Sequence, residues 1–162
     1  MHKKNIMKKI IIIFLGVFCS IITKAQDIVS KYTLSQLVGT VWVDNTDEEE
    51  ESTLAFYKTY YTVSVNFKTI NKTVENKYEY YLSDTPLQQS YDISIFDSLK
   101  VGNSEKGTYI IYKYESPKIK KIKGVDCYKI ESLDNKELLL FHKLTVKSVG
   151  GRDVYIRYKR VK

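Results

Sequence analysis

Apolar and polar residues alternate along much of the chain beyond residue 37, with the period of two that is typical of half-buried strands. The segment at 107–114, GTYIIYKY, is one example. No apolar run of helical period follows residue 25, while 14 tyrosines and many valine, isoleucine and threonine residues favour pleated segments. The pattern therefore predicts an all-β protein.

Short polar stretches, several with glycine or proline, separate the candidate strands. The predicted strands cover 38–43, 53–57 and 60–67 (as one long or two shorter strands), 73–82, 91–96, 107–114, 125–132, 137–144 and 153–161. Residues 30–37 predict a short helical turn before the first strand. About eight strands with short connections predict a closed, antiparallel up-and-down barrel, with a β-sandwich as the alternative.

The N-terminus has the layout of a secretory signal peptide. Four lysines precede an apolar run at 10–22, and small residues Thr23 and Ala25 follow it. As a helix the run would span about 20 Å, which is short of the roughly 30 Å bilayer core. We therefore expect cleavage after Ala25, one exported β domain at 26–162 that is periplasmic or extracellular, and no stable membrane span.

Cys19 within this segment offers a second interpretation, a lipid-modified cysteine at a lipoprotein processing site. Such sites need small residues just before the cysteine, whereas Phe18 is bulky, so we favour removal of Cys19 with the signal. Cys127 would then be the only cysteine left, which excludes an intramolecular disulfide and a thiolate zinc cluster in the processed chain. Packing must stabilise the fold.

The basic charge of the chain belongs largely to the predicted signal. The whole chain has 26 basic and 19 acidic residues, and five lysines but no acids lie in 1–25, which leaves 21 against 19, or +2. Nucleic-acid binding needs a concentrated basic face, so we expect no nucleic-acid partner. We interpret two charged stretches as solvated loops: the lysines at 118, 120, 121 and 123, and the acidic run from Asp44 to Glu51. The acidic run lacks the ligand spacing of a calcium loop, so we expect no metal site and no cofactor.

A two-residue turn at Asp134 and Asn135 would fix the register of one hairpin. Tyr128 and Ile130 would then share an apolar face with Leu139 and Phe141, and Cys127 would lie opposite His142 beside Lys129 and Leu140. A cysteine beside a histidine is the minimum for an activated thiolate. A flat sheet lacks oxyanion donors and a cleft, so we favour a pair without chemistry and expect no catalytic residues.

Several short motifs together resemble the small exported lipocalin-like proteins of Bacteroidetes. They are LVGTVW early in the domain, ENKYEYYLSD, GTYIIY, and the hairpin YKIESLDNKELLLF followed by YIRYKRV. The resemblance implies that Gly39 and Trp42 lie at the first strand and that Arg157 or Arg160 covers the indole ring, which closes one barrel end. This chain has one residue more between the glycine and the tryptophan than the family pattern. Either Gly39 precedes the regular pairing or the likeness is to a looser relative.

The resemblance also implies a non-catalytic binding protein for a small, partly apolar or aromatic ligand. The alternative is a filled barrel that binds an envelope protein or a polysaccharide. Tyrosine rings on the strands could line a ligand cavity, although ordinary sheet packing is the commoner use of any one of them. The candidate ligand-binding residues are Tyr57, Tyr61, Tyr78, Tyr80, Tyr109 and Tyr112.

Overall fold

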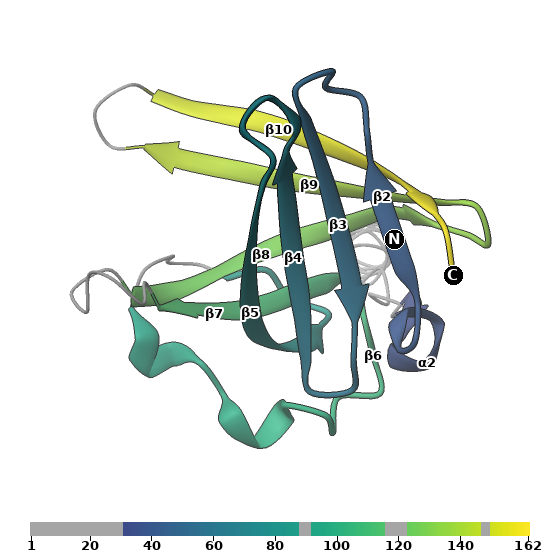
Figure 1. Cartoon of the computed structure of the whole chain (residues 1–162). Helices are drawn as coiled ribbons and strands as arrows, with labels where there is room; N and C mark the ends of the chain where they lie inside the picture. The colour runs from purple at the N-terminus through teal and green to yellow at the C-terminus, as the bar shows by residue number, and fades with distance from the viewer. Residues whose placement is uncertain (1–30, 88–91, 116–122, 147–149) are drawn as a thin grey trace, which may run out of the picture.

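The computed structural model describes residues 31–87, 92–115, 123–146 and 150–162, and in it eight antiparallel strands close into a barrel (Figure 1). The order around the barrel is β10-β2-β3-β4-β5-β7-β8-β9. The bounds are β2 Val41–Asp44, β3 Glu50–Phe56, β4 Tyr60–Phe67, β5 Lys72–Ser83, β7 Tyr109–Glu115, β8 Lys123–Leu133, β9 Glu137–Val146 and β10 Gly150–Arg160. The predicted all-β, eight-stranded antiparallel barrel is confirmed. The predicted signal peptide, with Cys19, and the lysines at 118, 120 and 121 lie outside the described residues.

The remaining elements are short. Helix α2 (Leu34–Leu37) occupies the predicted helical turn, and β1 (Tyr32–Thr33) pairs with β6 (Lys106–Gly107) as a separate two-stranded sheet. Three 3₁₀ turns complete the set: η1 (Lys68–Ile70), η2 (Ile93–Ile95) and η3 (Ser98–Lys100). The strand predicted at 91–96 is therefore wrong over its described part. Asp92 Oδ1 accepts the Ser94 N–H at 2.9 Å and starts η2 instead.

Two four-stranded sheets form the barrel, and they pair with each other only near one end. Strand β5 pairs with β7 at Tyr80–Ser83, and β10 pairs with β2 only at Lys159 and Arg160. Within each sheet the ladders are longer; β9 and β10, for example, pair at ten positions. Figure 1 shows the result, with β2–β5 and β7–β10 diverging from the shared end. We call the end where the sheets pair the closed end, and the other the open end.

Alternation along each strand sends one set of side chains into the barrel. At the closed end this set is fully buried and large. It includes Trp42, Phe56, Tyr80, Ile110, Ile130 and Leu138, and Leu37 of α2 is buried with them. Burial of these side chains is the main apolar contribution to the stability of the barrel.

A second, smaller cluster lies on the outside of the barrel. Tyr81, Ile111 and Val125 point outward from β5, β7 and β8, and Phe96 from the connection between β5 and β6 covers them. The outer face of these strands is therefore apolar as well, which explains why their sequences alternate less clearly than a half-solvated strand would.

Candidate functional site

Trp42 closes one end of the barrel. Its side chain is completely buried, and its indole Nε1 donates to Thr40 Oγ1 at 2.6 Å. The Thr40 hydroxyl donates in turn to the Leu37 carbonyl at the end of α2. The one tryptophan of the chain is thus held by the segment that leads into β2, and its polar atom is satisfied in the interior.

The position of Gly39 accounts for the extra residue before Trp42. Gly39 lies ahead of β2 with φ +81°, a left-handed conformation that favours glycine, and its N–H donates to the Phe56 carbonyl at 2.9 Å. The glycine therefore precedes the regular pairing, which is the first of the two alternatives that the sequence left open.

Arg160 is the cation over the indole, and Arg157 is not. The Arg160 guanidinium carbon lies 5.6 Å from the centre of the Trp42 ring, and the two residues are direct partners between β10 and β2. Arg157 has the opposite facing, lies outside the barrel and contacts Glu137 with 3.3 Å between Nη1 and Oε2. Of the two arginines expected to cover the indole, Arg160 therefore does so. Arg157 and Arg160 are three residues apart on one strand, so their side chains point to opposite faces and only one of them can reach the ring.

Four of the six candidate tyrosines point into the barrel and pack against one another. The Tyr61 ring lies 5.2 Å from Tyr78 and 5.8 Å from both Tyr80 and Tyr112, and Tyr78 lies 5.6 Å from Tyr112. The contacts of Tyr112 with Tyr61 and Tyr78 cross from one sheet to the other. These rings therefore bridge the sheets next to the level at which the backbone ladder between β5 and β7 stops.

The structure places Tyr57 and Tyr109 outside the barrel, against expectation. Tyr57 follows β3, is 46% exposed and stacks on Tyr60 at 4.5 Å. Tyr109 packs in the outer cluster, because it has the same facing on β7 as Ile111. Strand membership alone does not separate inward from outward tyrosines; the register does.

The hairpin register predicted from the sequence is wrong for two reasons. The turn lies one residue later than predicted, with Leu133 paired with Leu138 and the Asp134 N–H donating to the Glu137 carbonyl at 3.0 Å, and β8 contains a bulge. Ile130 pairs with Leu140, whereas Ser132 pairs with Leu139, so Glu131 is the extra residue. One extra residue reverses the facing of everything before it. Leu140 and His142 therefore point inward beside Tyr128 and Ile130, while Leu139 and Phe141 point outward.

The same bulge separates Cys127 from His142. Cys127 pairs with Ile111 and packs under the outer cluster, where burial raises the pKa of its thiol. His142 lies on the opposite face, inside the barrel. The two side chains cannot form a nucleophile–base pair, so the arrangement that would have suggested thiol chemistry is absent.

Instead, the interior holds an acid–imidazole pair that the sequence did not reveal. His142 Nε2 lies 2.8 Å from Asp126 Oδ2, and Asp126 Oδ1 accepts the Cys127 N–H at 2.8 Å. The side chains are only 11% and 17% exposed. The Tyr128 ring lies 4.9 Å from the imidazole and stacks on Tyr112 at 5.1 Å. Once the bulge is known, the alternation of β8 and β9 places these groups together.

The inward tyrosine hydroxyls remain protonated well into the alkaline range. Burial is the main cause that raises the pKa of Tyr61, Tyr78, Tyr112 and Tyr128, and it raises that of Tyr158 to about 12. The interior therefore offers neutral hydroxyl groups, which can donate or accept hydrogen bonds.

The deep interior is nearly filled, whereas the open end is not closed off from solvent. A cavity of about 10 Å³ lies among Leu54, Phe56, Tyr61, Val63, Ile110, Tyr128, Leu140 and Tyr158. That is close to the space for a single water molecule. Tyr78, Tyr114 and Tyr128 point inward but are only partly buried. The candidate site is thus the tyrosine and Asp126–His142 lining between the two sheets, towards the open end.

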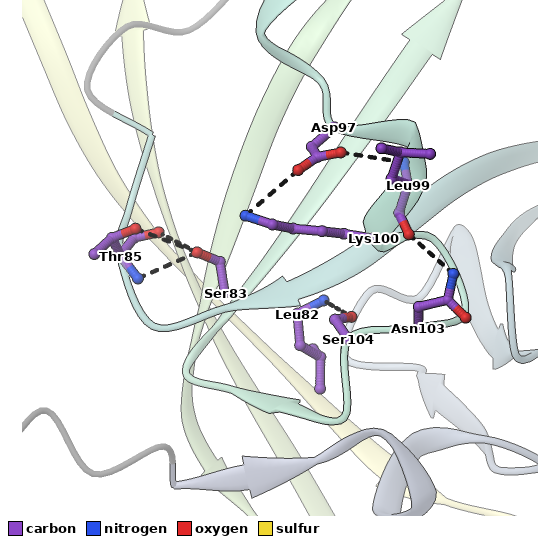
Figure 2. Close-up of polar contacts among 8 residues, drawn as sticks. All are labelled: Leu82, Ser83, Thr85, Asp97, Leu99, Lys100, Asn103 and Ser104. Carbon is purple, nitrogen blue, oxygen red and sulfur yellow. Dashed lines mark hydrogen bonds and ion pairs between the residues drawn. The ribbon is translucent and has the colours of Figure 1, made fainter.

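A different surface lies outside the closed end, along the connection between β5 and β6. Figure 2 shows its polar contacts: Ser104 Oγ accepts the Leu82 N–H at 2.8 Å, Asn103 Nδ2 donates to the Leu99 carbonyl at 2.9 Å, and Lys100 pairs with Asp97 at 3.6 Å. Asn103 and Ser104 line both of two open grooves, of about 620 and 390 Å³. Leu99, which lines the smaller groove, is 84% exposed.

No group of three or more His, Cys, Asp and Glu side chains gathers in the described part of the chain as a metal site would. Within that part, no helix is long and apolar enough to cross a membrane. The chain matches no protein-family model, no curated protein and no solved structure. The candidate site is therefore judged on its geometry.

Proposed function

We propose that this protein is an exported, non-catalytic binding protein that holds a small, partly apolar molecule between its two sheets at the open end. One observation carries the proposal. Inward tyrosines that span the sheets, Tyr78, Tyr112 and Tyr128, lie beside the buried Asp126–His142 pair where backbone pairing between the sheets has stopped. Ring faces supply apolar contact, and hydroxyl and imidazole groups supply a few directed polar contacts, which is the usual make-up of a ligand site.

The depth of the proposed site follows from packing. Because the lower interior leaves only about 10 Å³, a ligand would rest on the tyrosine layer and would not reach Trp42. The proposal includes export because the N-terminal apolar run, which lysines flank and which ends before Ala25, has the layout of a secretory signal peptide. The resemblance to lipocalin-like proteins supports the same class of function.

The test blocks the open end without touching the core. Val65 points inward on β4, opposite Ser52 and Val74, and Thr62 points outward on the same strand beside Lys77. Val65→Trp should weaken binding of the neutral fluorescent dye Nile red at least about tenfold, because the indole would occupy the space between the sheets. Thr62→Trp is the matched control and should bind as the parent does, with circular dichroism confirming that both variants fold.

The native ligand is sought by mass spectrometry of the protein under non-denaturing conditions, after purification from its own host. A bound small molecule that Val65→Trp loses and Thr62→Trp retains would support the proposal. Absence of both a co-purified molecule and Nile red binding in the parent protein would overturn it.

The filled lower interior favours a second candidate function. A filled barrel must bind its partner on the outer surface. Among the described residues, the two grooves beside Asn103 and Ser104 are concave outer surfaces that a partner could enter. An envelope protein or a polysaccharide would be the partner. Under this alternative, Ser104→Trp would abolish retention on host envelope material, whereas Val65→Trp would not.

A further inference from the structure

Asp126 is a largely buried carboxylate with little positive charge around it. His142 Nε2 lies 2.8 Å from its Oδ2, and its Oδ1 accepts the Cys127 N–H at 2.8 Å. Within the described part of the chain, no lysine or arginine forms an ion pair with it. A carboxylate has about four lone-pair sites, so Asp126 can accept further donors. A positive group that comes to it would stabilise its charge, because a carboxylate out of water needs compensation.

Aromatic rings flank this carboxylate on its own strand and on the neighbouring strands. Tyr112 is its direct cross-strand partner on β7, and Tyr128 is the next inward residue on β8. The Tyr112 ring stacks on Tyr128 at 5.1 Å, and Tyr78 of β5 lies 5.6 Å from Tyr112 in an edge-to-face contact. We call Tyr78, Tyr112 and Tyr128 the ring cluster. The carboxylate therefore lies beside ring faces and phenol oxygens.

The side of Asp126 that faces the open end has no side chain from its own strand. Strand β8 begins at Lys123 at that end, and the inward position between them is Gly124. The partner of Gly124 across the ladder is Tyr114, which points inward and is partly buried. Strand β8 therefore places nothing over the carboxylate on the side from which a ligand would enter.

Acidic side chains outnumber basic ones on the inner surface. The register directs Asp44, Glu50 and Asp126 inward. Among residues with described side chains, the inward lysine and arginine are Lys72, at the first position of β5, and Arg160, which covers the indole at the closed end. With the imidazole neutral, the described lining is net negative, which attracts a cation and repels an anion.

The phenol groups of the ring cluster suit the same charge. Burial is the main cause that raises the pKa of Tyr112 and Tyr128, and the charge of Asp126 adds to it. The hydroxyls are therefore neutral and can accept a hydrogen bond from an N–H donor. The faces of tyrosine rings attract cations as well, most strongly where water is excluded.

We propose that the ligand of the open-end site is a protonated amine on an apolar or aromatic body, with its ammonium group against Asp126 and the ring cluster. The inference rests on the proposed binding function and names its ligand class. The ammonium supplies the positive charge that Asp126 lacks, and the rest of the molecule packs on the tyrosine rings. An anion would meet the carboxylate, and an uncharged molecule would leave it without a counter-charge.

A probe series of matched size tests the ligand class on the parent protein. 2-Phenylethylamine is a cation at neutral pH, 2-phenylethanol is uncharged and 3-phenylpropanoate is an anion. In titrations followed by nuclear magnetic resonance, the amine should have a dissociation constant at least about tenfold below that of the alcohol, and the anion should bind most weakly. An amine that binds no better than the alcohol, or does not bind, would overturn the proposal. Nile red binding without a preference for the amine would refute this ligand class and leave the binding function standing.

Asp126→Asn tests the residue, because it removes the charge and keeps the size of the side chain. The variant should bind 2-phenylethylamine at least about tenfold more weakly and should bind 2-phenylethanol and Nile red as the parent does. Asp153→Asn removes an exposed acid from the outer face of β10 and is the matched control, with no change expected. Circular dichroism establishes that each variant folds, and the probe series decides the proposal on the parent protein if Asp126→Asn does not. A folded Asp126→Asn variant with unchanged affinity for the amine would show the proposal to be wrong.

Discussion

Trp42 is a structural residue whose position follows from its immediate neighbours. It is fully buried, its indole nitrogen is satisfied by Thr40, and the Arg160 guanidinium lies over its ring near solvent. Residues with apolar bodies and polar tips suit such a boundary, because one end can stay wet while the other is buried. The tryptophan therefore closes the barrel and lies outside the proposed ligand site.

The closure predicts a clear order of stability effects. Trp42→Ala should lower the free energy of unfolding by about 3–5 kcal/mol, because a large buried side chain is lost. Arg160→Gln should lower it by about 0.5–1 kcal/mol through the lost contact with the ring. Arg157→Gln is the matched control and should change it by less than about 0.5 kcal/mol, since its ion pair with Glu137 is exposed. Urea unfolding measures all three, and an Arg157 effect larger than the Arg160 effect would contradict this assignment.

Strand β8 shows how one residue decides the chemistry of an element. The bulge at Glu131 brings His142 inside to Asp126 and leaves Cys127 outside. It also frees the Glu131 carbonyl, which accepts the Tyr32 hydroxyl at 3.1 Å and so ties β1 to the barrel. The bulge therefore serves both the interior lining and the attachment of the N-terminal segment.

Removal of the bulge should be more damaging than removal of its side chain. Deletion of Glu131 would make the pairs Ile130–Leu140 and Ser132–Leu139 consecutive and keep every facing, but it removes the carbonyl that accepts the Tyr32 hydroxyl, so we expect the free energy of unfolding to fall by about 1–3 kcal/mol. Glu131→Ala keeps the backbone and loses only the ion pair with Lys129, so a change below about 1 kcal/mol is expected. Circular dichroism during heating distinguishes the two. A deletion variant as stable as Glu131→Ala would contradict the role of the bulge in attaching β1.

At the scale of the molecule, the barrel combines a packed end with a divergent end. The two sheets share a backbone ladder only around Tyr80–Ser83 and at Lys159 and Arg160, and beyond it the tyrosine rings hold them together. The closed end holds the largest buried side chains, and the proposed ligand site lies between the sheets beyond it. The buried hydroxyls of the ring layer are part of the same global structure, so they should titrate with its unfolding.

The molecule should therefore unfold at alkaline pH. Burial raises the pKa of Tyr61, Tyr112 and Tyr128 above the ordinary value of 10.0, so the unfolded chain loses these protons first as pH rises. Their contribution to stability is complete below pH 10 and falls above it, by about 1.4 kcal/mol per pH unit for each residue. Urea unfolding at several pH values measures how steeply the free energy of unfolding falls with pH. Tyr112→Phe should make this fall less steep by the contribution of one tyrosine. A free energy of unfolding that does not change above pH 10 would contradict the prediction.

Much of the fold could be predicted because strand alternation is local, but the candidate site could be predicted only in part. Inward facing was correct for Tyr61, Tyr78, Tyr80 and Tyr112 and incorrect for Tyr57 and Tyr109 among the tyrosines expected to line a cavity. Tyr114, Tyr128 and Tyr158 also point inward. Facing depends on the register between strands, and each register depends on turns and bulges that leave weak marks in a sequence.

The sequence by itself determined the all-β class, the approximate strand count, the helical turn before β2 and the closing position of Trp42. Each of these depends on side-chain period, turn residues or a short motif, which are local properties of the chain. Only the tertiary structure decided that Arg160 covers the indole, that Asp126 and not Cys127 meets His142, and that the sheets separate beyond Tyr80. These outcomes depend on a one-residue bulge and on where ladders between distant strands end, and both are set by packing across the whole barrel.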